Sequence, residues 1–426
     1  MRDIRSAREA FATAAWNLAA GTVRTPVTPF APGPRLSRHA HWFVAEDDSI
    51  LVAVVTTEEK YTVADEVLAY ALAWQGDRDL HLVLPKTMVP TTVTRLPWIS
   101  SPVKVWSHAG GDLTEVRTLA RIEVLERLRP LRPRVSKRFE LSEEHQQWIC
   151  DITPSDLDAH DRSYLSWHHR GLQVLKISTR RGGLRIQAGV QYSGRSVTVA
   201  PYDRTFDRAP TGTEVAEINA EVAAAVAADG SRSSRMREHR MQATLAYQAA
   251  DLGLKALHRE FPAYRGLDGS PSPRPGRPGY IDFLGVDAQE QFHVIETKIG
   301  HDPRVVLQAL DYAIWVQAHE PDLRRGMGLD ASDAGHSPHA RLPQMHLILG
   351  ADSKGLAFNG YLAPQLEALS GDCRVRVHLV PDVEATPLQL QALAPADYWI
   401  KAPMVANPVR GPRWAGRLND DLRATP

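Results

Sequence analysis

Two apolar, strand-like runs separated by a short polar turn stand out in residues 279–315, and charged side chains interrupt both runs. Asp282 lies in the first run, and Glu296 and Lys298 lie at the end of the second. Side chains alternate between the two faces of a strand, so Glu296 and Lys298 project from the same side. The turn at 287–291 is short enough for a hairpin that brings Asp282 beside Glu296. The segment therefore predicts two carboxylates and an ammonium at the open end of a hairpin.

A helix is predicted directly after this hairpin. Asp302 suits the N-cap, and Pro303 suits the first helical position. Gln308 and Tyr312 lie four residues apart and would share one face of the helix. The helix would thus add an amide and a phenol to the charged end of the hairpin.

A carboxylate pair of this kind suits a hard divalent cation. Mg²⁺ and Mn²⁺ prefer oxygen ligands, which two carboxylates, a backbone carbonyl and waters supply. Such an ion polarises a phosphate ester and lowers the pKa of a bound water. A lysine beside that water can orient it, help to deprotonate it or neutralise charge on the phosphate. The sequence indicates metal-dependent phosphodiester hydrolysis, with Asp282 and Glu296 as metal ligands. Two edge-strand acids in an exposed ion pair with Lys298 are the alternative.

In order and spacing, these residues resemble the PD-(D/E)xK nuclease superfamily, and Gln308 and Tyr312 resemble the QxxxY motif of its RecB-type branch. The resemblance covers about residues 235–350. It implies a restriction-endonuclease-like α/β fold with an αβββαβ core in the C-terminal half, and Mg²⁺ or Mn²⁺ as the cofactor. It also implies that Lys298 is the catalytic lysine and that Gln308 and Tyr312 support the site or the nucleic acid. Ile281 stands where the family motif has proline.

The same family often carries a glutamate on its first core helix. Glu238 is the counterpart here, within a stretch predicted to be helical. This resemblance adds Glu238 to the catalytic set. The alternative is a solvated charge that pairs with Arg235 or Arg237.

The function implied by the resemblance is that of a metal-dependent nuclease, either an endonuclease or an exonuclease, that acts on DNA in repair, restriction or phage defence. A catalytically silent nucleic-acid-binding module in a larger complex is one alternative, although a silent site has no reason to keep Asp, Glu and Lys together. An RNA-directed nuclease is another. The sequence has no P-loop, so helicase activity would need a partner ATPase or helicase. A homodimer is also compatible with the sequence.

The chain is long enough for several domains, each with its own core. We expect an α/β N-terminal domain over 1–130, a mainly β region over 131–205, the nuclease domain over 206–380 and a C-terminal tail over 381–426. In the first domain, alternating strands and a helix favour a partly parallel sheet. The predicted elements are strands at 50–57, 80–84 and 103–106 and a helix at 63–74. The basic, proline-broken segment 121–138 predicts a linker or an arm that faces nucleic acid.

A basic hairpin is predicted in the middle region, where two glycines follow two arginines between strand-like runs. Its cations are predicted to contact nucleic-acid phosphates, with nearby aromatics either stacking on bases or packing in the core. The predicted nucleic-acid-binding residues are Lys176, Arg180, Arg181 and Arg185, and the aromatics are Trp167 and Tyr192. A solvated charged surface is the alternative.

Residues 51–74 resemble a faded copy of residues 292–315. In this comparison Glu66 stands at the position of Gln308, and Thr56 at that of Glu296. The N-terminal domain is therefore either a degenerate nuclease-like copy that has lost its metal ligands or a product of generic strand–helix periodicity.

Composition adds few constraints. Fifty basic and fifty acidic residues give a formal net charge of zero, so DNA binding must come from local basic surface. Cys150 and Cys373 lie far apart and are predicted to be buried thiols in a reducing compartment. No apolar run approaches transmembrane length and no signal-peptide core is present, so we expect a cytoplasmic protein without membrane partners.

Overall fold

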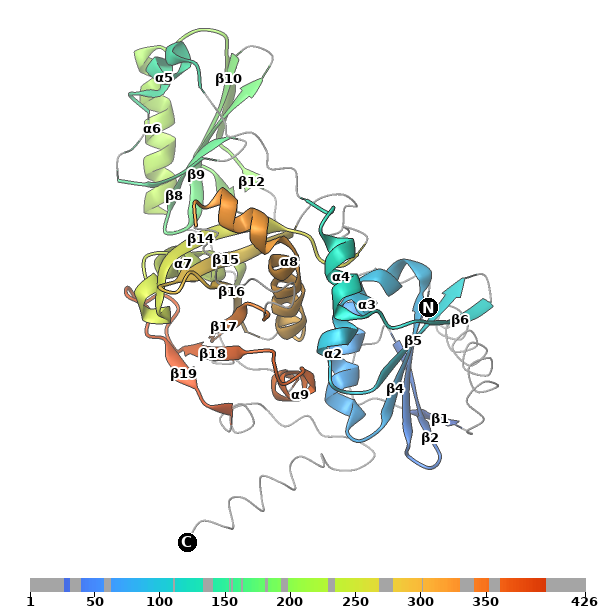
Figure 1. The fold of residues 1–426 in the computed structure, drawn as a ribbon. Coiled ribbons are helices and arrows are strands. Elements are labelled where there is room, and N and C mark those ends of the chain that lie inside the picture. Colours follow the sequence, from blue (N-terminus) through green and yellow to red (C-terminus); the bar gives the residue numbers. More distant parts are fainter. Residues whose placement is uncertain are drawn as a thin grey trace.

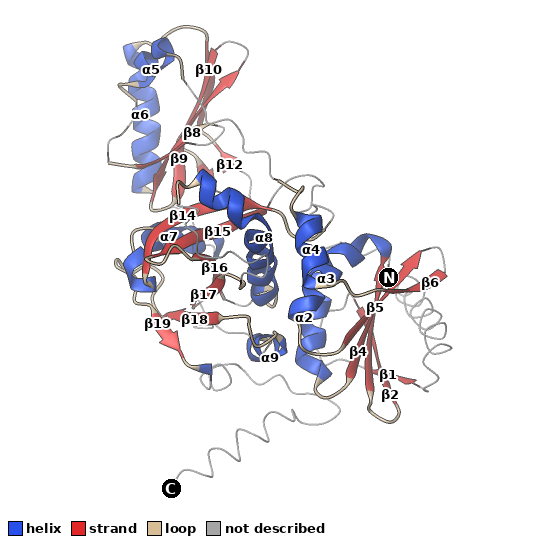
Figure 2. Cartoon of the chain, viewed as in Figure 1, coloured by secondary structure: helices blue, strands red, loops and turns tan. Residues whose placement is uncertain are grey.

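The computed structural model describes residues 27–30, 40–56, 63–109, 112–132, 141–152, 154, 156–161, 164–180, 183–192, 198–228, 234–267, 279–300, 302–329, 341–351 and 361–395. The chain is mixed α/β and forms three sheet-centred units, which we call the N-terminal, middle and C-terminal units (Figures 1 and 2). Within these residues, no helix is both long and apolar enough to span a lipid bilayer.

The N-terminal unit is built on a six-stranded sheet in the order β1-β2-β3-β4-β5-β6. Strands β3, β4 and β5 are parallel, and the other three pair antiparallel. Helix α2 connects β3 to β4 and packs on both, since its apolar residues reach the core of the sheet. The elements are β1 (Val27–Phe30), β2 (Ala40–Ala45), β3 (Ile50–Val55), α2 (Val63–Gln75), β4 (Asp79–Pro85), α3 (Val89–Arg95), β5 (Val103–Ala109) and β6 (Asp112–Val116), with 3-10 turns η1 (Lys86–Met88) and η2 (Leu96–Trp98) flanking α3.

The strands and the helix predicted for this unit are present. Their described ends lie within two residues of the predicted ends, except that β5 extends to Ala109. Helix α4 (Arg121–Leu128) corrects the prediction of a linker for the first part of residues 121–138, whereas residues 133–138 lie outside the described residues. Its apolar side chains, among them Val124 and Leu128, lie in the core beside α8 of the C-terminal unit. The prolines that suggested a linker follow the helix rather than interrupt it.

The middle unit holds a five-stranded antiparallel sheet in the order β13-β10-β9-β8-β7. The predicted hairpin joins β9 to β10, with Arg180 paired to Gly183. Helix α6 packs on this sheet through Ile218 and Val222, so the core of the unit extends past the expected boundary of 205 as far as Val226. The elements are α5 (Glu143–Ile149), β7 (Asp158–Asp161), β8 (Leu165–His169), β9 (Leu172–Arg180), β10 (Gly183–Ala188), β13 (Tyr202–Phe206) and α6 (Gly212–Ala227), with a small separate pair, β11 (Gln191–Tyr192) and β12 (Thr198–Val199).

The C-terminal unit begins with a helix, three strands, a second helix and a further strand. Its six strands lie in the order β14-β15-β16-β17-β18-β19, and β16, β17 and β18 are parallel. Helices α7 and α8 both contact β16. The elements are α7 (Ser234–Leu245), η3 (Ala249–Leu252), β14 (Leu254–Ala263), β15 (Gly279–Asp287), β16 (Phe292–Ile299), α8 (Val305–Gly326), β17 (Gln344–Gly350), α9 (Leu362–Ala368), β18 (Val375–Val380) and β19 (Gln391–Leu393). Because β19 pairs with β18, the segment expected to be a tail from residue 381 contributes to the sheet.

The N-terminal and C-terminal sheets have the same strand order and the same sequence of antiparallel and parallel pairings. Their helices meet between the two sheets, where α2 contacts α9 and α8 contacts α3 (Figure 1). The chain segments just before β5 and β18 also pair reciprocally. Ser100 N donates to Ala368 O at 2.8 Å, and Ser370 N donates to Trp98 O at 2.9 Å. The two units therefore meet through corresponding helices and through an antiparallel bridge between Ile99 and Leu369.

A closed ring of four buried charges crosses this interface. Arg95 of α3 binds Asp311 of α8 at 2.6 Å and Asp65 of α2 at 2.7 Å. Arg265, which follows β14, binds Asp311 at 2.7 Å and Asp65 at 2.9 Å. Each charge therefore has two opposite partners, as a buried ion requires. The ring connects the two units next to Tyr312.

The two cysteines are not both buried. Cys150 is exposed and Cys373 is partly buried, so the prediction of buried thiols is wrong for Cys150. Cys150 lies at the C-terminal end of the short helix α5, where its thiol donates to Gln147 O at 3.0 Å. Trp167, in contrast, is buried in the core of the middle unit, as packing predicts. The side chain of Tyr192 lies outside the described residues.

Candidate active site

The predicted hairpin is formed by β15 and β16. Phe283 pairs with Ile295, and the next residues toward the open end are Asp282 and Glu296. An antiparallel ladder continued by one step places these two residues opposite each other. The short turn and the apolar pattern of the strands together set this register. A slip by one residue would move the apolar side chains of a strand from the core face to the other face. The local sequence therefore brings the two acids together, as predicted.

Asp282 is held by the residue that follows Glu296. Its Oδ2 accepts hydrogen bonds from the backbone N of Thr297 at 2.8 Å and from Thr297 Oγ1 at 2.7 Å. Thr297 Oγ1 in turn accepts from Gln242 Nε2 of α7 at 2.8 Å. The carboxylate of Asp282 is thus fixed through one oxygen.

Glu296 is a buried carboxylate with an unsatisfied oxygen. The residue is 2% exposed, and its Oε1 has no hydrogen-bond partner among the described residues. Burial raises the pKa of Glu296 well above its usual value, and the nearby carboxylate of Asp282 raises the pKa further. Lys298 and the backbone N–H of Asp282 lower the pKa of Glu296 but do not cancel this rise. A buried carboxylate oxygen without a hydrogen bond is costly, so Glu296 points to a cationic ligand or a functional role.

Lys298 and Glu238 complete the charged cluster. Lys298 Nζ donates to Glu238 Oε1 at 3.2 Å, which connects β16 to α7. Burial alone would lower the pKa of Lys298, but the carboxylates of Asp282, Glu238 and Glu296 outweigh it and raise the pKa above the usual lysine value. Burial raises the pKa of Glu238, and Asp282 adds to that shift while Lys298 opposes it. Glu238 therefore faces the site, and the alternative of a purely solvated charge does not describe it.

Gln308 and Tyr312 lie on α8 as the spacing predicts. Tyr312 is buried, and burial together with the nearby Glu296 raises the pKa of its phenol. A side chain at Gly279 would place its Cβ 2.6 Å from Tyr312 Oη, so the glycine lets the start of β15 approach the phenol. Gln308 Oε1 is buried without a hydrogen-bond partner among the described residues.

The start of α8 differs from the prediction. The helix begins at Val305 with Arg304 at the N-cap position, so Asp302 and Pro303 precede it. Asp302 Oδ1 accepts from Arg304 N at 2.9 Å and from Arg304 Nε at 3.1 Å. Asp302 thus stabilises the turn before the helix rather than the first helical turn. The periodic face with Gln308 and Tyr312 is unaffected.

The donor set fits a divalent cation that keeps several non-protein ligands. In the part of the chain that the structure describes, no group of three or more His, Cys, Asp or Glu side chains could hold a metal. Asp282 and Glu296 would be the carboxylate ligands of the cation, and a backbone carbonyl and waters would fill the remaining coordination positions. Mg²⁺ is commonly bound by one or two carboxylates plus waters and phosphate oxygens. The orphaned Oε1 of Glu296 is the atom that such an ion would satisfy.

The predicted phosphate-binding cations lie on the middle unit, on a different sheet from the acids. Arg185 forms an ion pair with Asp203, with Nε to Oδ1 at 2.7 Å. Lys176 lies 4.1 Å from the ring centre of Tyr164, and burial lowers its pKa. Arg180 is exposed at the end of β9, and Arg181 lies outside the described residues. Asp203 therefore offsets part of the positive charge of this hairpin.

Two residues of the site were missed from the sequence. Thr297 donates to Asp282 and Gln242 donates to Thr297, yet neither side chain is ionisable and neither stood out in the sequence. A signal was present, since Gln242 follows Glu238 by four residues and so shares its face of α7. Thr297 lies between Glu296 and Lys298 and points to the opposite face, toward α7.

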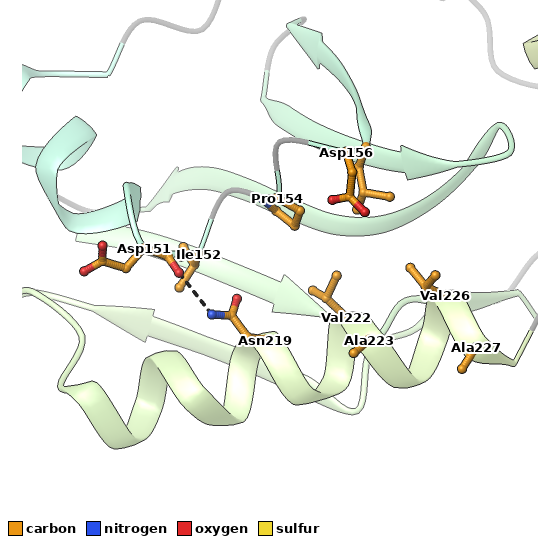
Figure 3. A pocket seen from close by; sticks show the side chains of 10 residues that line it. Asp151, Ile152, Pro154, Asp156, Asn219, Val222, Ala223, Val226 and Ala227 are labelled. Carbon is orange, nitrogen blue, oxygen red and sulfur yellow. Dashed lines mark hydrogen bonds between the residues drawn. The ribbon is translucent and has the colours of Figure 1, made fainter.

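A pocket of about 420 Å³ lies elsewhere, between α6 and the segment around Asp151 and Asp156 of the middle unit (Figure 3). Asn219 Nδ2 donates to the backbone O of Asp151 at its edge. The described residues that line it are mostly apolar and include two aspartates but no cation. The pocket does not suit a phosphate and is separate from the acids of the C-terminal unit.

Comparison of the chain with protein-family models, with curated proteins and with solved structures finds no match. The functional argument therefore rests on the residues and geometry of the site.

Proposed function

We propose that the chain is a metal-dependent nuclease that hydrolyses phosphodiester bonds of DNA. One observation carries the proposal: Glu296 is buried opposite Asp282, and its Oε1 has no hydrogen-bond partner among the described residues. The order α7, β14, β15, β16, α8, β17 supports it, because this is the αβββαβ order that the PD-(D/E)xK resemblance implies.

Each residue of the site has a distinct part in this proposal. Asp282 and Glu296 hold Mg²⁺ or Mn²⁺, which when bound polarises the phosphate and lowers the pKa of a water ligand. Lys298 carries a raised pKa and stays protonated, so its ammonium neutralises charge on the phosphate rather than removing a proton. Glu238 positions that ammonium through the 3.2 Å hydrogen bond.

The residues of α8 act as donors. Tyr312 stays protonated because its pKa is raised, so its hydroxyl can donate beside Glu296. Gln308 offers an amide whose Oε1 has no hydrogen-bond partner among the described residues, so it can accept from a water or a nucleotide. Both residues lie on one face of α8, where the buried Tyr312 would support the site and the partly exposed Gln308 would contact the substrate.

The test is cleavage of labelled DNA and RNA by the purified chain with Mg²⁺, with Mn²⁺ or with EDTA. Metal-dependent cleavage of DNA that is lost in Asp282→Asn and in Glu296→Gln is the expected result. Glu290→Gln, at the turn of the same hairpin, removes a carboxylate away from the site and should cleave normally. Cleavage of RNA alone would assign an RNA-directed nuclease. Binding without cleavage by the wild type would assign a silent nucleic-acid-binding module.

A further inference from the structure

A chain of directed hydrogen bonds ends at Asp282. Arg259 NH2 donates to Gln242 Oε1 at 3.3 Å, and Gln242 Nε2 donates to Thr297 Oγ1 at 2.8 Å. Thr297 Oγ1 then lies 2.7 Å from Asp282 Oδ2. The chain crosses from β14 through α7 to β16 and β15, so four elements of the fold fix the position of one carboxylate oxygen.

The direction of each bond follows from the chemistry of its donor. A guanidinium can only donate, so Arg259 requires the oxygen of the Gln242 amide, and the nitrogen must face Thr297. The amide nitrogen can only donate as well, so Thr297 Oγ1 accepts from it. The hydroxyl hydrogen is therefore directed at Asp282 Oδ2. Both the hydroxyl and the backbone N–H of Thr297 thus donate to the same oxygen.

We infer that Thr297 and Gln242 are positioning residues of the metal site, which hold Oδ2 of Asp282 so that Oδ1 is the oxygen presented to a divalent cation. The inference rests on the proposed function. Gln242 is 3% exposed and Thr297 is fully buried, so neither side chain reaches the substrate. Their effect passes through Asp282 alone. Partners that orient a metal-binding carboxylate typically change metal affinity by roughly 10- to 100-fold when they are removed.

The variant that tests this is Thr297→Val, which keeps the branched shape and the backbone N–H but removes the hydroxyl. We expect the affinity for Mn²⁺, measured by calorimetry on the full chain, to fall roughly 10- to 100-fold. Thr297→Ser should restore most of it, because serine keeps the hydroxyl. Gln242→Leu, which removes the donor but not the hydroxyl, should give a smaller loss. Thr244→Val is the matched control, since its hydroxyl donates only to Arg240 O of its own helix, at 3.3 Å.

A kinetic readout separates positioning from simple structural damage. In Thr297→Val, raising the Mn²⁺ concentration should recover most of kcat, because the metal site is weakened and not removed. In Asp282→Asn it should recover none. Thermal unfolding of each variant checks that the fold is retained. If Thr297→Val fails to fold, Gln242→Leu carries the test, and wild-type Mn²⁺ affinity in that variant would then overturn the inference.

The outcomes are distinct. Wild-type Mn²⁺ affinity in folded Thr297→Val overturns the inference and leaves the proposed function standing if the wild type cleaves DNA. A loss of affinity that Thr297→Ser does not restore also overturns it, because the hydroxyl would then be irrelevant. Failure of the wild type both to bind Mn²⁺ and to cleave overturns the proposed function and this inference together.

Discussion

The N-terminal and C-terminal units share a topology but not a chemistry. Both sheets run through two antiparallel strands into three parallel strands and end on an antiparallel one, with a helix crossing between the first two parallel strands. The strands of both are packed with buried aliphatic residues. The comparison teaches that the apolar pattern specifies the sheet, whereas a few residues at strand ends decide whether it holds a charged site.

The strand registers show which residues of the N-terminal unit correspond to the charged residues of the C-terminal unit. Leu80 of β4 pairs with Leu51, and the equivalent Met345 of β17 pairs with Val294. Two residues further along, Ala53 therefore corresponds to Glu296. The sequence comparison had placed Thr56 there, and this assignment is wrong.

The same registers give the counterparts of the other two charged residues. Trp42 is paired with Ala53 and so corresponds to Asp282, and Val55 corresponds to Lys298. All three counterparts in the N-terminal unit are apolar and buried. That unit therefore has the strands of the site without a carboxylate at either metal-binding position.

The largest effect is expected when a residue of the charged site is replaced by its apolar counterpart from the N-terminal unit. Glu296→Ala gives the C-terminal unit the residue found in its counterpart, and we expect DNA cleavage to fall by about 10³-fold or more, because a metal ligand supports several kcal/mol of transition-state stabilisation. Its stability to urea should rise, because a buried carboxylate is removed. Near-wild-type cleavage in this variant would remove Glu296 from the site.

The converse exchange is Ala53→Glu in the N-terminal unit. Ala53 is fully buried, so the new carboxylate would lack partners and should destabilise the chain by about 3–5 kcal/mol in urea unfolding. We expect no second metal site, since Trp42 and Val55 supply neither a carboxylate nor an ammonium. A variant that stays as stable as the wild type would contradict the buried position of Ala53.

The charge ring tests whether the two units fold as one. Arg95→Met from the N-terminal unit and Asp311→Asn from the C-terminal unit each leave buried charges without their partners. Each should cost about 3–5 kcal/mol in a single cooperative urea transition. Arg117→Met breaks an exposed pair with Glu123 and should change stability little. Two separate unfolding transitions in the wild type would show that the ring does not couple the units.

The hairpin and the helix that carry the site could be predicted because their signals are local. A short turn fixed Asp282 opposite Glu296, and helical spacing placed Gln308 and Tyr312 on one face. The assignment of Thr56 to the position of Glu296 failed because it did not follow the strand register. An alignment on Tyr70 and Tyr312 places Val54 at that position, and the pairing of β3 with β4 places Ala53 there.

Other features depend on residues far apart in the sequence. The partners of Asp311 come from segments separated from it by 216 and 46 residues, and no local pattern announces them. Helix α4 was taken for a linker because its charges are visible in the sequence, whereas the surface of α8 that buries Val124 is not. The pairing of Arg185 with Asp203 needed the register of β10 with β13. Long-range packing thus decided what local patterns left open.

A smaller effect distinguishes the two sheets at acidic pH. In the C-terminal sheet His346 Nε2 lies 3.0 Å from His293 Nδ1, and His346 Nδ1 lies 3.2 Å from His378 Nε2. His293 Nε2 contacts Asp287 at 3.1 Å, and Arg376 also affects both His346 and His378. In the N-terminal sheet, His81 takes the position of His346 and lies beside Trp106.

Burial lowers the pKa of His346 to about 3 and those of His378 and His81 to about 4. The unfolded chain therefore binds more protons between pH 6.5 and about 4, so these histidines destabilise the fold as pH falls through that range. Glu296 and Glu238, whose pKa values are raised, act in the opposite direction.

Thermal unfolding of wild type and His346→Leu at pH 7.5 and pH 5 isolates the histidine contribution, because the two glutamates are common to both proteins. We expect the fall in Tm between the two pH values to be smaller in His346→Leu. His81→Leu should reduce the fall in Tm less. His81 has no histidine neighbour among the described residues, and its pKa is lowered less than that of His346. Equal pH dependence in wild type and His346→Leu would contradict the buried, neutral state of His346.

The smallest expected effect concerns the middle unit, which has no counterpart in either sheet of the pair. Arg180 is exposed, whereas Arg185 is engaged by Asp203 at 2.7 Å. If the hairpin contacts DNA, Arg180→Glu should weaken binding several-fold and reduce the slope of log affinity against log salt by about 1. Arg185→Gln should change the slope less, because Asp203 already offsets its charge. Fluorescence anisotropy with labelled DNA over a salt series, in EDTA to prevent cleavage, measures both. An unchanged slope in Arg180→Glu would assign Arg180 to a solvated charged surface that does not contact DNA.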